Sequence, residues 1–244
     1  MNLSIKRICM KILGKFDLFI PENKKINFIY FLYRFEEKPE RELFNLDFFI
    51  KKKGNAIDIG SNHGLWSYKL SKIKNINKIY AFEPNLKLSK VKSNYFKKIK
   101  VYGVALSNKN GEEILETPIL NNYECHGLSK IYNSKEKWPK KFINFKRKQI
   151  KIKKLDSYNF TNISFIKIDV EGHELKVLNG GKKFFLKNKP NCIIEIEKKN
   201  FTKVHNFFLN LKCKYKVSKK SYKGIKLAKQ NYLYSTEANN GKQN

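Results

Sequence analysis

The stretch AIDIGSNHGLWS, residues 56–67, decides the fold, because it places an apolar run directly before a glycine-bearing turn and a helical pattern. An acid, Asp58, lies inside the apolar run, and Gly60 and Gly64 enclose three polar residues. The pattern predicts a buried strand, a turn whose backbone can approach a ligand, and a helix with free N–H groups at its start. The dinucleotide fingerprint has a third glycine between these two, and its absence here weakens a pyrophosphate-binding interpretation.

Beyond this stretch, apolar runs typical of strands alternate with helical patterns over roughly 150 residues. This alternation predicts an α/β fold with a mostly parallel twisted sheet and helices on both faces. We expect residues 1–53 to form a helical extension, residues 54–235 the α/β domain and residues 236–244 a disordered tail.

Several segments have a definite local prediction. RELFNLDFFIKKKG, residues 41–54, is expected to be one helix that ends at Gly54. A hairpin is expected around Asn110-Gly111, and residues 117–148 are expected to be irregular and polar. Residues 173–188 are expected to form one helix that contains a glycine pair, and the segments CKYKVSKK and NYLYST to form a closing pair of strands.

Acids gather where the predicted strands end. The five ends are Asp58 to Gly64, Glu83, Ala105 to Ser107, Asp169 to His173, and Glu195 with Glu197. Parallel sheets bind ligands outside the carboxyl ends of their strands. Unpaired carboxylates repel one another and are costly to desolvate, so their gathering indicates a functional site. Glu83 lies about 20 residues after the glycine turn, where an acid typically contacts ribose hydroxyls, and this predicts a nucleoside-containing cofactor.

Six segments occur in a characteristic order: DIGSNHGLWS, YAFEP, GVALS, LDSY, FIKIDVEGHELKVLNGG and IIEIE. Over about residues 55–197 the sequence thereby resembles the FkbM-type methyltransferases, a Rossmann-like family that uses S-adenosylmethionine. The pair of motifs DIGxNxGxxS and IKIDVEGxE carries most of this resemblance. The resemblance implies that residues 54–235 are a methyltransferase domain and that the acceptor is a saccharide hydroxyl, in a surface glycan or a glycosylated metabolite.

The resemblance also implies roles for the cofactor-binding residues. Asp58 and Gly60 would shape the methionine end of the pocket, and Asn62 and Gly64 would support the turn. Glu83 would hold the ribose. The adenine would lie near Ala105, Leu106 and Ser107.

The second motif supplies the expected chemistry. Methyl transfer to a hydroxyl requires that the acceptor oxygen be aligned and its proton removed. Asp169, directly behind the buried run FIKI, is the first choice for the base, with Glu171 and His173 beside it, while Glu174 is expected only to favour a helix start. If a divalent metal such as Mg²⁺ acidified the hydroxyl instead, which we consider the less favoured route, its oxygen ligands would be Asp169, Glu171 and Glu195.

Two other histidines lie near these motifs. His126, in the polar segment NNYECHGLSK, is expected either to contact the acceptor or act as the base, or to be an exposed loop residue. His63 stands where the family has a small or apolar residue, and we expect it on the surface rather than in catalysis.

The net charge of +31 indicates a polyanionic partner and makes an RNA methyltransferase the first alternative. However, only four of the 52 basic residues are arginine, whereas nucleic-acid recognition favours arginine for its bidentate contacts. Abundant lysine, asparagine and isoleucine are also what an AT-rich coding sequence produces, so nucleic acid is the less favoured partner. A non-catalytic cofactor-binding or membrane-associated scaffold is a third alternative. The acids at the strand ends argue against it.

The chain is expected to be cytoplasmic. Its apolar runs fall short of the ~20 residues of a membrane span, and Lys11 and Lys15 interrupt what would be a signal peptide. Its four cysteines form no CxxC site and are expected to be reduced. Residues 4–16 have the pattern of a basic amphipathic helix, which we expect to pack on its own domain, with peripheral contact to an anionic membrane as the alternative.

Overall fold

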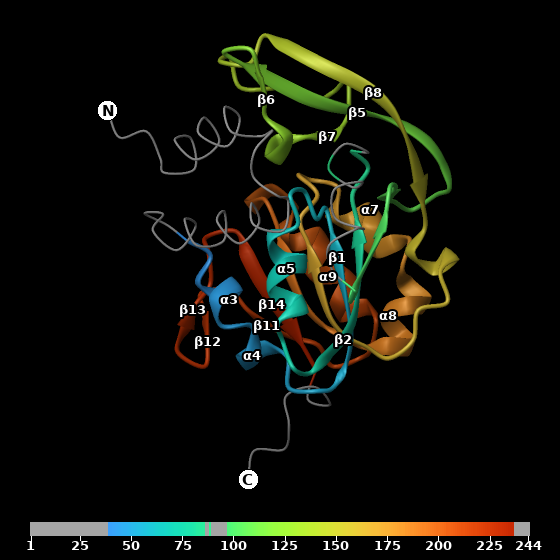
Figure 1. The fold of residues 1–244 in the computed structure, drawn as a ribbon, viewed down its shortest axis with the longest axis vertical. Helices are drawn as coiled ribbons and strands as arrows, with labels where there is room; N and C mark the ends of the chain where they lie inside the picture. Colours follow the sequence, from blue (N-terminus) through green and yellow to red (C-terminus); the bar gives the residue numbers. More distant parts are fainter. Residues whose placement is uncertain (1–38, 86–87, 89–96, 237–244) are drawn as a thin grey trace.

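The computed structural model describes residues 39–85, 88 and 97–236, and its centre is a seven-stranded sheet in the order β11-β14-β10-β9-β1-β2-β3 (Figure 1). These strands are β1 (Gly54–Ile59), β2 (Ile76–Phe82), β3 (Ile99–Tyr102), β9 (Ile163–Ile168), β10 (Asn191–Glu195), β11 (Lys216–Ser218) and β14 (Asn231–Ser235). All pairs from β3 to β10 are parallel, whereas β14 runs antiparallel to both β10 and β11. The predicted, mostly parallel sheet and the closing pair of strands are therefore confirmed.

The order of the strands creates a switch point between β1 and β9. The chain leaves β1 toward β2 on one side, whereas β9, much later in the sequence, pairs with its other side. Ligands of open α/β sheets bind outside the carboxyl ends of the strands at such a point. The glycine turn follows β1 directly and the second motif follows β9, so both predicted motifs lie at this position.

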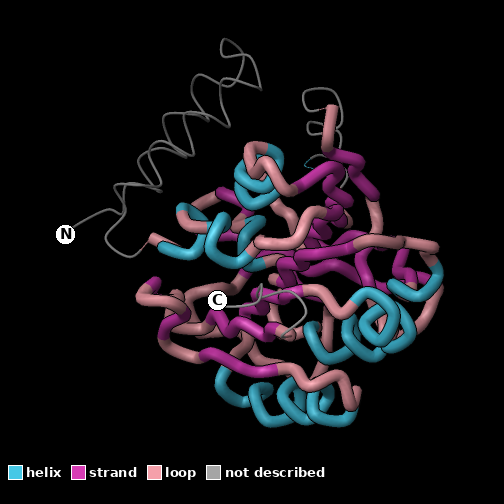
Figure 2. The backbone as a smooth tube through the Cα atoms, turned by 90° about the horizontal axis from the view of Figure 1, so that it is seen from below, coloured by secondary structure: helices cyan, strands magenta, loops and turns pink. Residues whose placement is uncertain are grey.

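Apolar side chains form one core cluster on each face of the sheet. All six residues of β9 are buried, and its alternating side chains divide between the faces, with Ile166 in one cluster and Phe165 in the other. One face is covered by α7 (Glu174–Asn179), α8 (Lys182–Asn188) and α9 (Phe201–Asn210), and the other by α3 (Arg41–Phe44), α4 (Leu46–Phe49), α5 (Leu65–Ser71) and the small hairpin of β12 (Ser221–Tyr222) and β13 (Ile225–Lys226). Figure 2 shows helices on both sides of the strands, as the sequence predicts.

A second sheet projects from the main domain, and we call residues 108–154, which build most of it, the arm (Figure 1). Its strands are β4 (Ala105–Leu106), β5 (Gly111–Leu120), β6 (Tyr123–Glu124), β7 (Lys130–Ile131) and β8 (Asn144–Lys153), and the short helix η1 (His126–Leu128) lies between β6 and β7. β5 and β8 pair antiparallel from Gly111 opposite Ile152 to Ile119 opposite Asn144. The prediction that residues 117–148 are irregular is therefore wrong. The strands were not visible in the sequence because β8 is mostly exposed and has few apolar residues that would mark it as a strand.

The hairpin predicted around Asn110-Gly111 is also wrong. Gly111 begins β5, but the partner of β5 is β8, far along the sequence, and not the preceding strand. The Asn110 side-chain oxygen instead accepts the backbone N–H of Lys154 at 2.8 Å. This asparagine thus closes the base of the arm.

Two predicted helices are each divided into two. In residues 41–54, α3 and α4 meet at Asn45, whose amide donates to the Arg41 carbonyl at 2.7 Å, and Gly54 already belongs to β1. In residues 173–188 the break lies at the glycine pair between α7 and α8. A Cβ at Gly180 would lie 1.9 Å from the Ser107 carbonyl oxygen, so the close approach of these two segments requires glycine.

Some predictions fall outside the described residues. They are the amphipathic helix at residues 4–16, most of the helix expected after Pro84, and the tail beyond Thr236. Among the residues that the structure describes, no helix is both long and apolar enough to span a membrane. Cys125, Cys192 and Cys213 are free thiols, as expected.

Candidate active site

A cavity opens at the carboxyl ends of β1, β2 and β9 and encloses about 690 Å³ of space that is continuous with solvent. Most of the site residues predicted from the sequence line it: Gly60, Asn62, Glu83, Ala105, Leu106, His126, Asp169, Glu171 and His173. The other predicted residues are not part of its wall: Asp58, Gly64, Ser107 and Glu195. The structure thus brings together two motifs that are about a hundred residues apart in the chain.

The glycine turn is shaped by its contact with the end of β9. Gly60 has φ +76°, and a Cβ there would lie 1.8 Å from the carbonyl oxygen of Asp169. The Asp169 N–H donates to the Ile59 carbonyl at 3.0 Å, so the two strand ends are in direct contact. Gly64, with φ +85°, precedes the first residue of α5. Only glycine satisfies both the conformation and the space at Gly60.

Glu83 connects the turn to the end of β2. Its side chain is 7% exposed, and its two oxygens accept the backbone N–H groups of Asn62 at 2.8 Å and Asn85 at 2.9 Å. Each carboxylate oxygen can accept more than one hydrogen bond, so Glu83 retains acceptor capacity toward the cavity. Asn62 Oδ1 is buried and has no hydrogen-bond partner. Such an orphaned acceptor is costly, and a donor group on a ligand would satisfy it.

Asp58 is 1% exposed and accepts a hydrogen bond from the Ser67 hydroxyl of α5. It therefore connects β1 to α5 behind the turn. Its predicted contact with the methionine end of a cofactor stays a prediction, because Asp58 does not line the cavity.

The part of the cavity around β4 is apolar. Ala105 and Leu106 line it together with Phe82, and their predicted contact with an adenine stays a prediction. Ser107 is turned away from the wall, and its hydroxyl lies 2.9 Å from Nε2 of His173. Burial, with a smaller contribution from Lys176, lowers the pKa of His173 to about 4. His173 is therefore neutral near pH 7 and a weak base.

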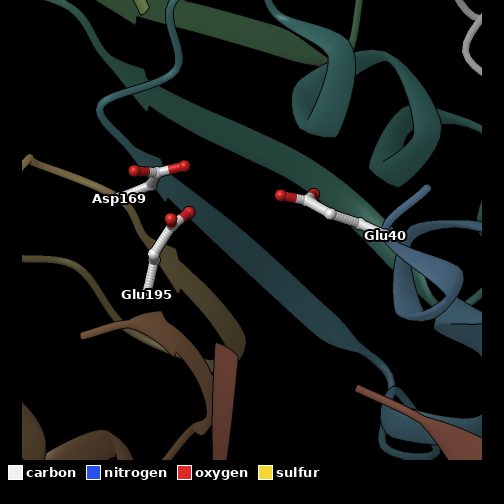
Figure 3. Close-up of side chains that lie close together, drawn as sticks. All are labelled: Glu40, Asp169 and Glu195. Atoms are coloured by element: carbon white, nitrogen blue, oxygen red, sulfur yellow. The ribbon is translucent and has the colours of Figure 1, made fainter. Parts of the chain in front are cut away.

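Three carboxylates, from Glu40, Asp169 and Glu195, lie within 4.8 Å of one another at the strand ends. Figure 3 shows them pointing toward one another, with Glu40 reaching in from the segment before α3. Among the residues that the structure describes, no other cluster of three or more His, Cys, Asp or Glu side chains is close enough to hold a metal ion. The cluster contains Glu40, whereas the prediction had Glu171. It shares Asp169 and Glu195 with the predicted metal ligands.

A buried lysine compensates the charge of this group. Lys167 is fully buried in β9, and its ammonium lies 3.8 Å from Asp169 Oδ2 and 3.0 Å from Asn231 Oδ1. It also lies 4.9 Å from the centre of the Trp66 ring. The neighbouring carboxylates raise the pKa of Lys167 against the opposing effect of its burial. Because an internal cation already pairs with these acids, the structure gives no support for a Mg²⁺ ion among them.

Glu171 and Glu174 both have raised pKa values but differ in their contacts. Burial is the largest cause that raises the pKa of Glu171 to about 8, and the charges of Asp169 and Glu195 add to it. Burial also raises the pKa of Glu174 to about 7, while its Oε1 accepts the Gly172 N–H at 2.8 Å. Glu174 therefore closes the turn before α7, as expected, whereas Glu171 lines the cavity with a pKa near neutral pH.

The two other histidines lie as follows. His126, in η1 of the arm, lines the cavity, and its Nδ1 lies 3.3 Å from the Asn85 amide. It is thus not an ordinary exposed loop residue, and its contact with an acceptor stays a prediction. His63 is exposed, as predicted.

Sequence reasoning missed several residues of the site. The sequence did contain a signal for Lys167, because a charged residue inside the apolar run FIKI indicates a buried and paired ion. The sequence contained no such signal for Glu40, since this residue precedes every motif. The arm residues Leu115, Lys130 and Ile131, which also line the cavity, lie in a segment without a recognisable pattern.

Known proteins share parts of this sequence and of this fold. The model of the methyltransferase FkbM domain matches residues 58–217. Among solved structures, the methyltransferase FkbM from Methylobacillus flagellatus KT is similar at 14% identity with a TM-score of 0.55, covering 93% of this chain and 58% of that chain. This chain therefore spans 58% of the length of that protein. No curated protein matches the sequence.

Two further solved structures have lower TM-scores. A protein of Streptococcus mutans described as a methyltransferase, in complex with SAH, has a TM-score of 0.44 at 14% identity and covers 78% of this chain and 93% of its own. An rRNA methylase from Streptococcus thermophilus has a TM-score of 0.42 at 10% identity and covers 80% of this chain and 90% of its own. The fold assignment rests on the first structure and on the family model.

Proposed function

This chain belongs to the family of FkbM methyltransferases, and we propose that it is an S-adenosylmethionine-dependent O-methyltransferase that acts on a saccharide hydroxyl. The acceptor would belong to a surface glycan or a glycosylated metabolite. One observation carries the proposal: the glycine turn, Glu83 and Glu171 line the same cavity. One part of that cavity suits a nucleoside without a phosphate, and the other offers a group that can take a proton.

The residues of the cavity fit this cofactor. Glu83 has acceptor capacity for ribose hydroxyls, and the unpaired Asn62 oxygen needs a donor. Ala105 and Leu106 offer an apolar surface to the adenine ring. Bound there, S-adenosylmethionine would supply a methyl group that its positively charged sulfur already activates.

We assign the removal of the hydroxyl proton to Glu171. A general base is most effective when its pKa lies near the working pH, and that of Glu171 is raised to about 8. Asp169, the first choice from the sequence, is paired with Lys167 at 3.8 Å, and its negative charge is one cause of the raised pKa of Glu171. In this proposal Asp169 tunes Glu171, and His126 contacts the acceptor from the arm. His173 is too weak a base for the role.

RNA is the second candidate acceptor, because the net charge of +31 favours a polyanion. A cytoplasmic location is part of the proposal and is supported by the free thiols of the described residues. Contact of the N-terminal segment with an anionic membrane is the alternative.

A methyl-transfer screen tests the proposed function. Labelled S-adenosylmethionine would be supplied with methyl glycosides, nucleotide sugars, glycan fractions and RNA. We expect label in a saccharide. Label in RNA alone, with a rate that falls steeply as salt rises, would contradict the saccharide and support the RNA alternative. Absence of label in every acceptor would contradict both and favour the non-catalytic scaffold.

A further inference from the structure

A second cavity adjoins the first and shares Ile131, Glu171 and His173 with it. It encloses about 650 Å³ of space that is open to solvent, between the arm and the turn that precedes α7. Its other lining residues are Glu113, Tyr132, Asn133, Glu136, Gly172 and Lys176. Because Glu171 lines both cavities, a molecule in the second can reach this carboxyl group without occupying the first.

On the basis of the proposed methyl transfer, we propose that the second cavity is the acceptor site and that it takes a neutral, multiply hydroxylated ring against Tyr132 of the arm. The arm would then determine acceptor specificity, while the sheet holds the cofactor. Three features of the cavity support this assignment: the way Tyr132 is held, the polar groups around it, and its charge.

Tyr132 is 37% exposed, yet a network of side chains holds its ring in place. The Arg147 guanidinium lies 4.5 Å from the ring centre, and Arg147 Nε donates to Glu116 at 2.7 Å. The indole N–H of Trp138 donates to the other oxygen of Glu116 at 2.6 Å. Glu116 is 3% exposed, and burying a carboxylate is costly unless it is paired. Because this paired guanidinium packs against the Tyr132 ring, we assign the network to the positioning of Tyr132.

The polar groups of the cavity suit hydroxyls. Glu136 accepts from Lys130 at 2.9 Å and Glu113 from Lys109 at 2.8 Å, and these hydrogen bonds lower the pKa of both acids. Both carboxylates are therefore ionised acceptors that already have a counter-charge. Lys176, which also lines the cavity, adds a donor. Acceptors and donors around an aromatic face are suited to a polyol, whose hydroxyls do both.

The charges of the cavity are largely compensated, although the whole chain is strongly basic. Three acids line the cavity: Glu113, Glu136 and Glu171. Lys176 is the one lysine or arginine among its lining residues in the described part of the chain. Lysines pair with Glu113 and Glu136, and the raised pKa of Glu171 keeps most of this carboxyl group protonated near pH 7, so the lining suits a neutral ligand. The same cavity has no unpaired strong acid that would call for a cationic acceptor, because lysines already pair with Glu113 and Glu136.

Kinetics of paired variants test this inference. The probes are methyl glycosides of hexoses and 6-deoxyhexoses, with labelled S-adenosylmethionine, and cofactor affinity is measured by calorimetry in parallel. Tyr132→Ala should raise KM for the methylated glycoside about tenfold with little change in kcat or in cofactor affinity. Tyr132→Phe should remain close to the wild type. The matched control is Tyr123→Ala, since Tyr123 lies on the same arm, is 62% exposed and lines neither cavity.

Two results would overturn the inference. If Tyr132→Ala had no larger effect on KM than Tyr123→Ala, the cavity would not be the acceptor site. If no glycoside were methylated, the neutral polyol would be the wrong class. Failure of the proposed methyl transfer itself would look different, because the wild type would then not bind S-adenosylmethionine in the calorimeter.

Discussion

Replacing Glu171 with glutamine should make the folded protein more stable at neutral and alkaline pH. The pKa of Glu171 is raised from 4.5 to about 8 by burial and by neighbouring acids. Between these values the folded protein keeps a proton that the unfolded chain releases, so the wild type loses stability as pH rises. The loss is about 1.4 kcal/mol per pH unit and ends near the folded pKa. Because Glu171 keeps some exposure, we expect a total on the order of 3 kcal/mol relative to Glu171→Gln.

Urea denaturation followed by circular dichroism at about pH 5, 6.5 and 8 measures this difference. Glu171→Gln and the wild type should be nearly equal at the lowest pH, and the variant should be more stable at the highest. Glu112→Gln is the matched control, because Glu112 is an exposed carboxylate on β5, and it should follow the wild type at every pH. A constant difference between wild type and Glu171→Gln across the range would refute the reasoning.

The same pKa predicts the pH dependence of catalysis. Near pH 7 only about a tenth of a base with a pKa of 8 is ionised, so the rate should rise about tenfold toward pH 9. Glu171→Gln should lose about 10² to 10⁴ in kcat and all of this pH dependence. A wild-type rate that is flat over this range would contradict the assignment of Glu171 as base.

Three other perturbations have definite outcomes. Gly60→Ala should abolish cofactor binding and lower stability by more than about 2 kcal/mol, because its Cβ meets the Asp169 carbonyl; calorimetry and thermal melting check this, and an unchanged Tm would contradict it. Lys167→Met should cost about 3 to 5 kcal/mol near neutral pH and less in acid, since it leaves Asp169 and Glu195 without their cation; an equal loss at both pH values would argue against the ion pairing. Glycoside methylation should change little between about 50 and 200 mM salt, whereas a steep fall would indicate a polyanionic acceptor.

The part of the cavity that we propose for the cofactor could be located from the sequence, because its residues follow strand ends. Gly60, Asn62 and Glu83 are fixed by local patterns, and parallel pairing of β1 with β2 places their strand ends together. Asp58 shows the limit of this reasoning, because sequence spacing does not reveal that its carboxylate accepts a hydrogen bond from Ser67 of the following helix.

The proposed acceptor cavity could not be predicted in the same way. Glu40 reaches the acids from a segment with no motif, and Tyr132 reaches the second cavity only because β5 pairs with the distant β8. Long-range pairing of a polar ribbon depends on contacts across many residues of chain, which local propensity does not encode. Lys167 is the exception, since a lysine inside an apolar run was visible from the start.

Calorimetric titration with S-adenosylmethionine tests the central claim most directly, namely that one cavity holds the cofactor at Glu83 and the base at Glu171. The wild type should bind the cofactor, Glu83→Ala should lose at least about tenfold in affinity, and Glu171→Gln should bind as the wild type does. Equal affinity of Glu83→Ala and the wild type, or no binding by the wild type, would contradict the account.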